Sequence, residues 1–313
     1  MEELISSLSR LCPGGVHRNV SLAQFSRWKI GGIADLVVEP GSLEELSALR
    51  AFISREGLAN VVIGETSNLL FADEGLRAIC IRIGSRLANV QVDGDELVAD
   101  AGIWVPCFAR RVMQAGLTGA EHICGIPGTL GGLICMNGGS QGNNIGTAVL
   151  AVTAVNKDGV ALTLSQKECG FAYRRSVFQE QDLVISKARL RFLQIEEKRV
   201  VRRQMSALLH DRNCKFPRKK PNCGSVFKSN PAMYAEFGPP GAVIERMGFK
   251  GYRIGDAVVS TQHANFFVNE GSARAADMLR LIREVREAVY AESGHQMEAE
   301  VRFVTQEGSI VSA

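Results

Sequence analysis

Two glycine-rich stretches have the residue types that hold a phosphate-bearing ligand. Residues 125–132, GIPGTLGG, run on into 136–142, MNGGSQG, and a second loop at 64–70 follows the apolar run 61–63. Glycine lets a backbone adopt positive φ and lie against a ligand, and successive N–H groups in such a loop bind phosphate. Two such loops fit a dinucleotide; the alternative is a structural turn beside a tightly packed helix.

Three further side chains suit chemistry on a charged substrate. Arg174 stands in FAYRRS next to Arg175, and either guanidinium could bind a carboxylate through two N–H groups. Ser225, in NCGSVFK, is more typical of a structural Gly-Ser turn. Glu300, two residues after Glu298, also fits an exposed carboxylate at a strand edge. Residue types alone leave these alternatives open.

Length, composition and charge narrow the class of protein. The chain has 313 residues, enough for two or three domains, with 46% hydrophobic and 22% charged residues, as in a globular protein. A net charge of +3 gives no argument for nucleic acid. The basic run 215–220 is most simply a solvated face, although a phosphate-steering role stays open.

Targeting signals and metal-binding patterns are missing from the sequence. No apolar stretch is long enough to cross a bilayer, and the MEE start lacks the basic residues of a signal peptide. The eight cysteines include no CxxC pair and no histidine spacing suited to zinc. We therefore expect a cytoplasmic protein without metal, membrane or nucleic-acid partner, and with reduced thiols.

The elements that position these residues show mixed α/β periodicity. A strand at 33–38, a helix from Ser42 to Gly57 with Glu45 completing a capping box, and a strand at 60–63 lead into the first glycine loop. Short strands follow at 78–83, 89–92 and 97–99, with an Asp-Gly turn at 93–95, and a helix at 104–116. The remaining strands of this part are expected at 148–156 and 160–164, joined by a second Asp-Gly turn at 158–159, and at 183–192.

A third part is expected to begin near 194–203 with a charged amphipathic helix. Its apolar positions are Val200, Val201, Met205 and Leu208. A long helix from about residue 272 carries Leu279, Ile282, Val285 and Val289 on one face before Gly294, and a strand at 299–304 closes the chain. The sequence thus predicts an α+β fold of two lobes plus a C-terminal α+β domain.

Several motifs, taken in order, resemble the UDP-N-acetylenolpyruvoylglucosamine reductase (MurB) family. The resemblance runs from about residue 19 to 303. Its motifs are KIGGIAD at 29–35, SNLL at 67–70 with Asp73 and Gly75, the loop 125–132 with Met136 and Asn137, Tyr173 and Arg174 with Ser176, 222–227, Ser260 with His263, and Glu300 with Val301. The short spacing from Ser225 to 251–255 resembles the branch without an inserted tyrosine loop.

The resemblance implies a particular architecture. It implies a PCMH-type FAD-binding domain over residues 1–198, with two lobes divided near 66–76, and a substrate-binding domain over 199–313. The residues implied to bind FAD are Gly64, Thr66, Ser67, Asn68, Leu69, Gly125, Ile126, Gly128, Thr129, Gly131, Gly132 and Asn137. We expect a monomer.

The resemblance also implies a reaction. Hydride passes from NADPH to flavin N5 and then to C3 of the enolpyruvyl group of UDP-N-acetylglucosamine enolpyruvate, which gives UDP-N-acetylmuramate for peptidoglycan. Arg174 would stabilise the charge that develops, Ser225 would protonate C2, and Glu300 would polarise the substrate carboxyl. Tyr173, Lys228 and His263 would bind substrate. With no GxGxxG fold beside the flavin domain, both substrates are expected to use one site in turn.

Three positions depart from the family pattern. Thr66 stands where glycine is usual, so positive φ there would strain the backbone by about 1–3 kcal/mol and loosen flavin binding. Phe216 and Gln141 replace a common glutamine and a common aromatic residue. Two other functions remain as alternatives: another FAD oxidoreductase on the same scaffold, and a non-catalytic flavin- or nucleotide-sugar-binding paralogue.

Overall fold

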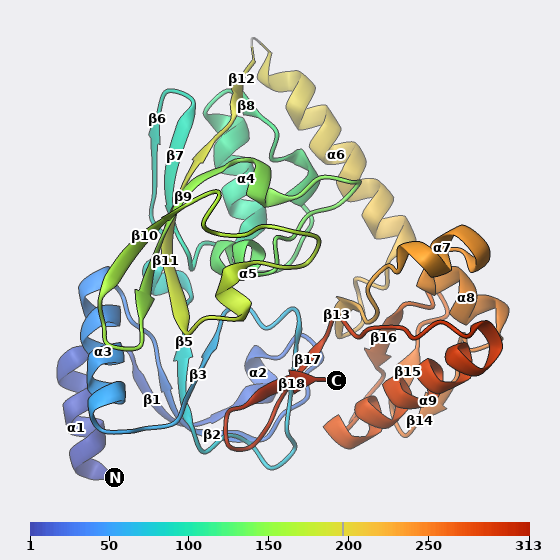
Figure 1. The fold of residues 1–313 in the computed structure, drawn as a ribbon, viewed down its shortest axis with the longest axis horizontal. Helices are drawn as coiled ribbons and strands as arrows, with labels where there is room; N and C mark the ends of the chain where they lie inside the picture. The colour runs from blue at the N-terminus through green and yellow to red at the C-terminus, as the bar shows by residue number, and fades with distance from the viewer. Residues whose placement is uncertain (196) are drawn as a thin grey trace. The chain divides into compact units, whose positions relative to one another are not determined.

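The computed structural model describes residues 1–195 and 197–313 and divides the chain into two compact units (Figure 1). Each unit has its own buried apolar core. Unit 1 consists of Met1–His17, Leu36–Glu65 and Ile79–Arg212, and unit 2 of Arg18–Asp35, Thr66–Ala78 and Asn213–Ala313. Two N-terminal segments therefore share a core with the C-terminal part. The functional division into 1–198 and 199–313 stays a prediction.

The first sheet of unit 1 has the strand order β1-β2-β5-β3, and β1 and β2 run on across the unit boundary. Strand β5 pairs in parallel with β2 and β3. The helices α1 and α3 pack beside each other (Figure 1). The bounds are α1 (Glu2–Leu11), β1 (Val16–Ser21), β2 (Ile33–Val38), α3 (Leu43–Arg55), β3 (Asn60–Ile63) and β5 (Ile79–Arg82).

Helix α3 forms for the reasons that its sequence indicates. The Ser42 hydroxyl accepts a hydrogen bond from the Glu45 backbone N–H at 3.1 Å and caps the first turn. Leu46 and Ile53 bury the apolar face of the helix. Gly57 ends it with φ +62°, a conformation that glycine adopts without steric cost. The predicted helix is confirmed.

The second sheet of unit 1 is antiparallel, with the order β10-β9-β11-β7-β6. The turns at Gly94 and Gly159 have φ +58° and +81°, so the two predicted hairpins are confirmed. The remaining strands and helices of unit 1 are β6 (Val90–Asp93), β7 (Glu96–Asp100), α4 (Val105–Gln114), β8 (Leu117–Thr118), α5 (Leu130–Cys135), β9 (Val149–Asn156), β10 (Ala161–Ser165), β11 (Leu183–Arg191), β12 (Leu193–Gln194) and α6 (Lys198–Lys215).

Helix α6 begins at Lys198, within the segment 194–203 where we expect it; position 196 in that segment lies outside the described residues. Val201 and Met205 are buried as predicted. Val200, however, is 44% exposed, so its assignment to the apolar face was wrong. Because 3.6 residues make one turn, Val200 and Val201 point about 100° apart, and only Val201 faces the core.

Unit 2 contains two sheets, of order β13-β16-β15-β14 and β18-β17-β4. Helix α9 packs on β14 and β15 and buries Ile282, Val285 and Val289 before Gly294 ends it at φ +69°. Its elements are α2 (Leu22–Phe25), β4 (Leu69–Phe71), β13 (Asn222–Ser225), α7 (Pro231–Phe237), α8 (Pro240–Arg246), β14 (Arg253–Ile254), β15 (Ala257–Val259), β16 (Phe266–Asn269), α9 (Ala275–Ser293), β17 (Arg302–Val304) and β18 (Ile310–Ser312). The α+β class is confirmed.

The predicted start of the closing strand was wrong. Strand β17 begins at Arg302, and Glu300 lies before it. The Glu300 backbone N–H donates to the Val226 carbonyl at 2.7 Å, and Ala299 forms an isolated bridge with Phe227. These contacts with the segment after β13 replace the ladder that a longer strand would need.

Candidate functional site

The two glycine-rich loops meet at Gly64 and Thr129. A Cβ at position 64 would lie 2.4 Å from the Thr129 hydroxyl oxygen, so only glycine permits this approach. Thr129 caps α5, because its hydroxyl accepts from the Gly132 N–H at 3.3 Å. A Cβ at Gly131 would lie 2.9 Å from the Ala101 Cβ. Close backbone packing therefore explains these glycines in unit 1.

The second loop also presents backbone donors. Gly125 and Gly128 are buried, yet within the described part of the chain their N–H groups have no hydrogen-bond acceptor. The N–H of Glu65, in the first loop, likewise has none there. Buried backbone N–H groups are almost always paired, so these donors fit an anionic ligand such as the diphosphate of a dinucleotide.

Asn137 ties the second loop to the segment that carries Tyr173 and Arg174. Its side-chain amide donates to the Ala172 carbonyl at 2.8 Å, and its carbonyl oxygen accepts from the Gly146 N–H at 3.0 Å. Asn137 is 4% exposed and has φ +41°. Two hydrogen bonds thus hold a residue in a conformation that side chains rarely adopt.

Arg174 and Arg175 have different surroundings. Arg175 is exposed and forms an ion pair with Glu180 at 2.7 Å. Arg174 is half-buried, has φ +55°, and its guanidinium lies 5.5 Å from the centre of the Tyr173 ring. Its carbonyl accepts from the Gln179 side chain at 3.0 Å. Arg174 is therefore the better placed of the two to meet a ligand.

In unit 2 the loop 66–69 lies beside Glu300. The Asn68 side chain donates to the Glu300 carbonyl at 2.8 Å, and the Arg302 N–H donates to the Asn68 carbonyl at 3.0 Å. Strand β4, which begins at Leu69, runs parallel to β17. The Thr66 hydroxyl donates to the Phe25 carbonyl at 2.8 Å, and Thr66 has φ +51°, in the strained region considered above.

Ser225 ends β13 in the same unit. It is half-buried, and Gly224 before it has φ +81°, held by the Asn222 side chain, which accepts from the Gly224 N–H at 3.0 Å. The next residue, Val226, accepts from the Glu300 N–H. The structure thus brings Ser225, the loop 66–69 and Glu300 onto adjoining segments.

Lys228 and His263 are the two other residues of unit 2 that are expected to bind substrate. The Lys228 ammonium forms an ion pair with the Glu298 carboxylate, and the backbone N–H of Lys228 donates to the Glu298 carbonyl at 2.9 Å. The imidazole of His263 accepts from the Asn265 N–H at 3.2 Å and lies 5.3 Å from the Phe216 ring. Burial, and then the charge of Lys250, lowers the pKa of His263 below its usual value, which favours the neutral imidazole.

The expected site residues form two sets. Unit 1 holds Gly64, Gly125, Ile126, Gly128, Thr129, Gly131, Gly132, Asn137, Tyr173 and Arg174, and unit 2 holds Thr66, Ser67, Asn68, Leu69, Ser225, Lys228, His263 and Glu300. The sequence interpretation missed Asn265, whose side chain hydrogen-bonds both backbone groups of Phe227. Its place two residues after His263 was the available signal.

Over residues 1–195 and 197–313, no group of three or more His, Cys, Asp and Glu side chains is arranged to hold a metal ion. In the same ranges no helix combines the length and apolarity that crossing a membrane requires.

Comparisons with known proteins assign the class. Residues 34–165 match a family model described as an FAD binding domain, over the region that holds both glycine loops. Residues 215–304 match the model of the UDP-N-acetylenolpyruvoylglucosamine reductase C-terminal domain, over the region that holds Ser225 and Glu300. The protein is an FAD-dependent oxidoreductase.

The chain belongs to the UDP-N-acetylenolpyruvoylglucosamine reductase (MurB) family, which acts in peptidoglycan precursor synthesis. It is 42% identical to UDP-N-acetylenolpyruvoylglucosamine reductase 1 of Corynebacterium glutamicum, over 92% of this chain and 86% of the relative. It is 37% identical to the reductase of Halalkalibacterium halodurans, over 97% and 99%. The crystal structure of the Thermus caldophilus enzyme superposes with a TM-score of 0.77 at 31% identity, covering 92% of this chain and 98% of that one.

Proposed function

We propose that this protein uses NADPH to reduce the enolpyruvyl group of UDP-N-acetylglucosamine enolpyruvate to UDP-N-acetylmuramate. The observation that carries the proposal is the placement of Ser225. Its half-buried hydroxyl stands at a turn that is hydrogen-bonded to the Glu300 segment, and that segment is hydrogen-bonded to Asn68. A proton donor and a carboxyl group on adjoining segments are what protonation next to a carboxylate needs.

FAD, when bound, supplies the hydride-transfer chemistry. The residues of the loops fit it: the buried N–H groups of Gly125 and Gly128 are donors for phosphate oxygens, and Thr129 and Asn137 hold the loop in shape. In unit 2, Thr66, Ser67, Asn68 and Leu69 are proposed to complete the binding of the cofactor. The Thr66 hydrogen bond to Phe25 offsets part of the strain at φ +51°.

Arg174 is proposed to bind the carboxylate of the substrate and the negative charge that develops beside it. Arg174 is half-buried, and its guanidinium offers paired N–H donors to a carboxylate. Arg175 is engaged by Glu180, so it is a weaker candidate. Tyr173, whose ring faces the Arg174 guanidinium, is proposed to contact the same substrate group.

Ser225 is proposed to donate the proton to C2, and Glu300 to polarise the carboxyl group of the substrate. A serine hydroxyl is a weak acid, so its oxygen must be stabilised as the proton leaves. Lys228, which forms an ion pair with Glu298 in the structure, is proposed to help bind substrate. His263, as a neutral imidazole, is proposed to contribute a hydrogen bond to substrate without adding charge.

NADPH and the sugar nucleotide are proposed to use one site in turn, which gives ping-pong kinetics. The supporting feature is that the chain contains no GxGxxG motif for a second dinucleotide. Parallel double-reciprocal lines are expected. Intersecting lines, together with a trapped ternary complex, would exclude this order.

The direct test follows the visible absorbance of the flavin in the purified protein. Anaerobic NADPH should bleach the flavin, and UDP-N-acetylglucosamine enolpyruvate should restore it. Ser225→Ala should bleach normally and recover at least about 100-fold more slowly, whereas the exposed control Ser272→Ala should recover at the normal rate.

Two outcomes would favour the alternatives. Bleaching without restoration by the sugar nucleotide would indicate another FAD oxidoreductase on this scaffold. A protein that binds FAD and the sugar nucleotide but is never bleached by NADPH would indicate the non-catalytic binding function.

A further inference from the structure

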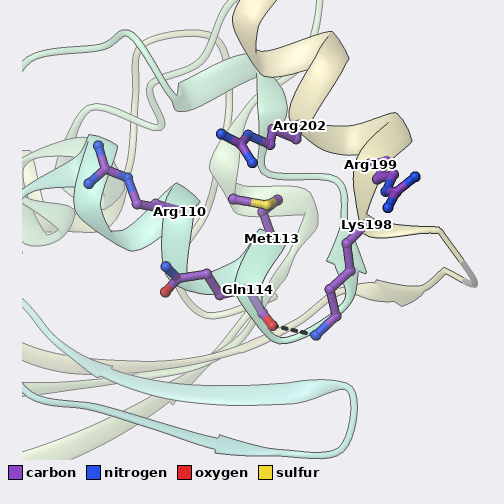
Figure 2. Close-up of a pocket in the computed structure, with 6 residues that line it drawn as sticks. All are labelled: Arg110, Met113, Gln114, Lys198, Arg199 and Arg202. Atoms are coloured by element: carbon purple, nitrogen blue, oxygen red, sulfur yellow. Dashed lines mark hydrogen bonds between the residues drawn. The ribbon is translucent and has the colours of Figure 1, made fainter.

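A cavity of about 640 Å³ in unit 1 contains none of the site residues described above. It lies between α4 and the start of α6 and is lined by Arg110, Met113, Gln114, Lys198, Arg199 and Arg202 (Figure 2). Four of these six residues are cationic and none is acidic. In Figure 2, Arg110 of α4 lies to the left of Met113, and Arg202 of α6 lies above it.

Among the described residues, no acidic side chain pairs with the three arginines of this cavity. Across the described chain, Arg110, Arg199 and Arg202 form no ion pair and no side-chain hydrogen bond, and all three are exposed. Some other arginines of unit 1 are paired, as Arg82 is with Glu39 and Glu65. Gathering like charges raises the free energy of the protein unless an anion offsets the repulsion.

Backbone and side-chain contacts hold the walls of the cavity in place. The Lys198 ammonium donates to the Gln114 carbonyl at 2.7 Å, and the Ile195 N–H donates to the Gly116 carbonyl at 3.1 Å. Strands β12 and β8 pair just before α6. The first turn of α6 carries no acidic residue, and Glu197, whose carbonyl accepts from the Val200 N–H at 3.1 Å, directly precedes it.

We propose that this cavity binds a small anion that carries two linked phosphates, of the size of a nucleoside diphosphate. A single phosphate is matched by one or two cations, whereas four cations on two helices match a diphosphate. The volume is within the range of small-molecule sites, about 300–1,000 Å³. Met113 offers an apolar surface against which a ring could lie.

Helix α6 connects the cavity with the second glycine loop. A Cβ at Gly125 would lie 2.7 Å from the Arg212 Cδ and 3.2 Å from the Leu209 Cδ2, both from α6. An anion that fixes the first turn of α6 thus restrains a helix that packs against the loop. Occupancy of the cavity is therefore expected to slow the release of FAD.

The test measures calorimetric binding of inorganic pyrophosphate and of ADP to the FAD-loaded full chain at low ionic strength. Arg110→Gln/Arg202→Gln should weaken binding at least about tenfold, because it removes two of the four cations that line the cavity, one from each helix. The matched control is Arg111→Gln/Arg203→Gln, which makes the same charge change on the same helices outside the cavity lining. It should bind normally. Unchanged flavin absorbance and unfolding temperature would show that both variants are folded.

Each outcome decides the proposal. Equal affinities for the two probes would identify the diphosphate as the recognised group, and tighter ADP binding would show that the nucleoside takes part. ADP that still binds to both double variants would be held at a site other than this cavity. Absence of binding, or equal weakening in the two double variants, would overturn the site. Binding that leaves the FAD release rate unchanged would overturn the link through α6.

Discussion

Asn265 holds Phe227 by two hydrogen bonds: the Phe227 N–H donates to the Asn265 side-chain oxygen at 3.0 Å, and the Asn265 amide donates to the Phe227 carbonyl at 2.9 Å. A third bond joins the Val226 N–H to the Asn265 carbonyl at 2.8 Å. Val226 and Phe227, the two partners of Asn265, directly follow Ser225 in the chain. Asn265 is 6% exposed, so it fixes the backbone of the turn from the inside, and we expect it to position Ser225, the proposed proton donor.

Asn265→Ala is expected to lower kcat about 10- to 100-fold with KM nearly unchanged, because a serine displaced by a fraction of an ångström donates its proton poorly. Loss of two buried hydrogen bonds should also cost about 2 kcal/mol of unfolding free energy. Steady-state kinetics and urea unfolding measure both effects. Asn265→Asp keeps the acceptor for the Phe227 N–H and should recover part of kcat.

The matched control is Asn269→Ala, at the end of strand β16, which begins directly after Asn265. Asn269 is 4% exposed and donates to the Trp28 carbonyl at 2.9 Å, but it does not touch the serine turn. It should lose comparable stability and keep its kcat. If both variants lose kcat equally, Asn265 has only a structural role.

Local patterns in the sequence were enough to predict most elements. The apolar run that becomes β3, the Ser42 cap of α3 and the Asp-Gly turns are set by neighbouring residues, and the structure confirms them. The prediction of Val200 on the apolar face failed because it assigned two adjacent residues to one side of a helix.

Contacts between distant segments could not be read from the sequence. Trp28 donates to the Phe267 carbonyl at 2.7 Å, which places an N-terminal segment in the C-terminal core. The position of Glu300 depends on the Val226 carbonyl, and the role of Asn265 depends on Phe227, 38 residues away. Periodicity carries no information on such pairings.

Thr66 provides a test of backbone strain in the first loop. Thr66→Ala keeps φ near +51° and loses the hydrogen bond to Phe25, so it should cost about 1–2 kcal/mol of unfolding free energy. Thr66→Gly loses the same bond but relieves the strain, so the holoenzyme should be less destabilised than with alanine. Urea unfolding of both variants measures the difference; a glycine variant less stable than the alanine variant would contradict the account.

His263 should make the stability of unit 2 fall in mild acid. Burial, followed by the charge of Lys250, lowers its pKa in the folded protein, so near and below pH 6.5 the unfolded chain binds a proton that the folded chain resists. The free energy of unfolding should therefore decrease between pH 7.5 and 5.5, and His263→Gln should flatten that decrease. In a Trp104→Phe background the buried Trp28 reports unfolding of this unit. If the unfolding free energy of His263→Gln falls with pH as steeply as that of the unchanged protein, the decrease does not come from His263.

Asp73 caps helix α9 from the segment that follows the first loop. Its two carboxylate oxygens accept from the Ala275 N–H at 2.8 Å and the Ala276 N–H at 3.2 Å. Asp73→Ala should cost about 1–2 kcal/mol, because two N–H groups of the first turn lose a charged acceptor, and Asp73→Asn should retain part of it. Thermal unfolding measures the loss.

Asp277→Ala, which removes the bond from the Arg274 N–H at 3.1 Å, is the control for the same helix end. Because Asp73 also anchors the chain that leaves residues 66–69, only Asp73→Ala should speed the release of FAD; equal release from both variants would show that the cap stabilises the helix alone.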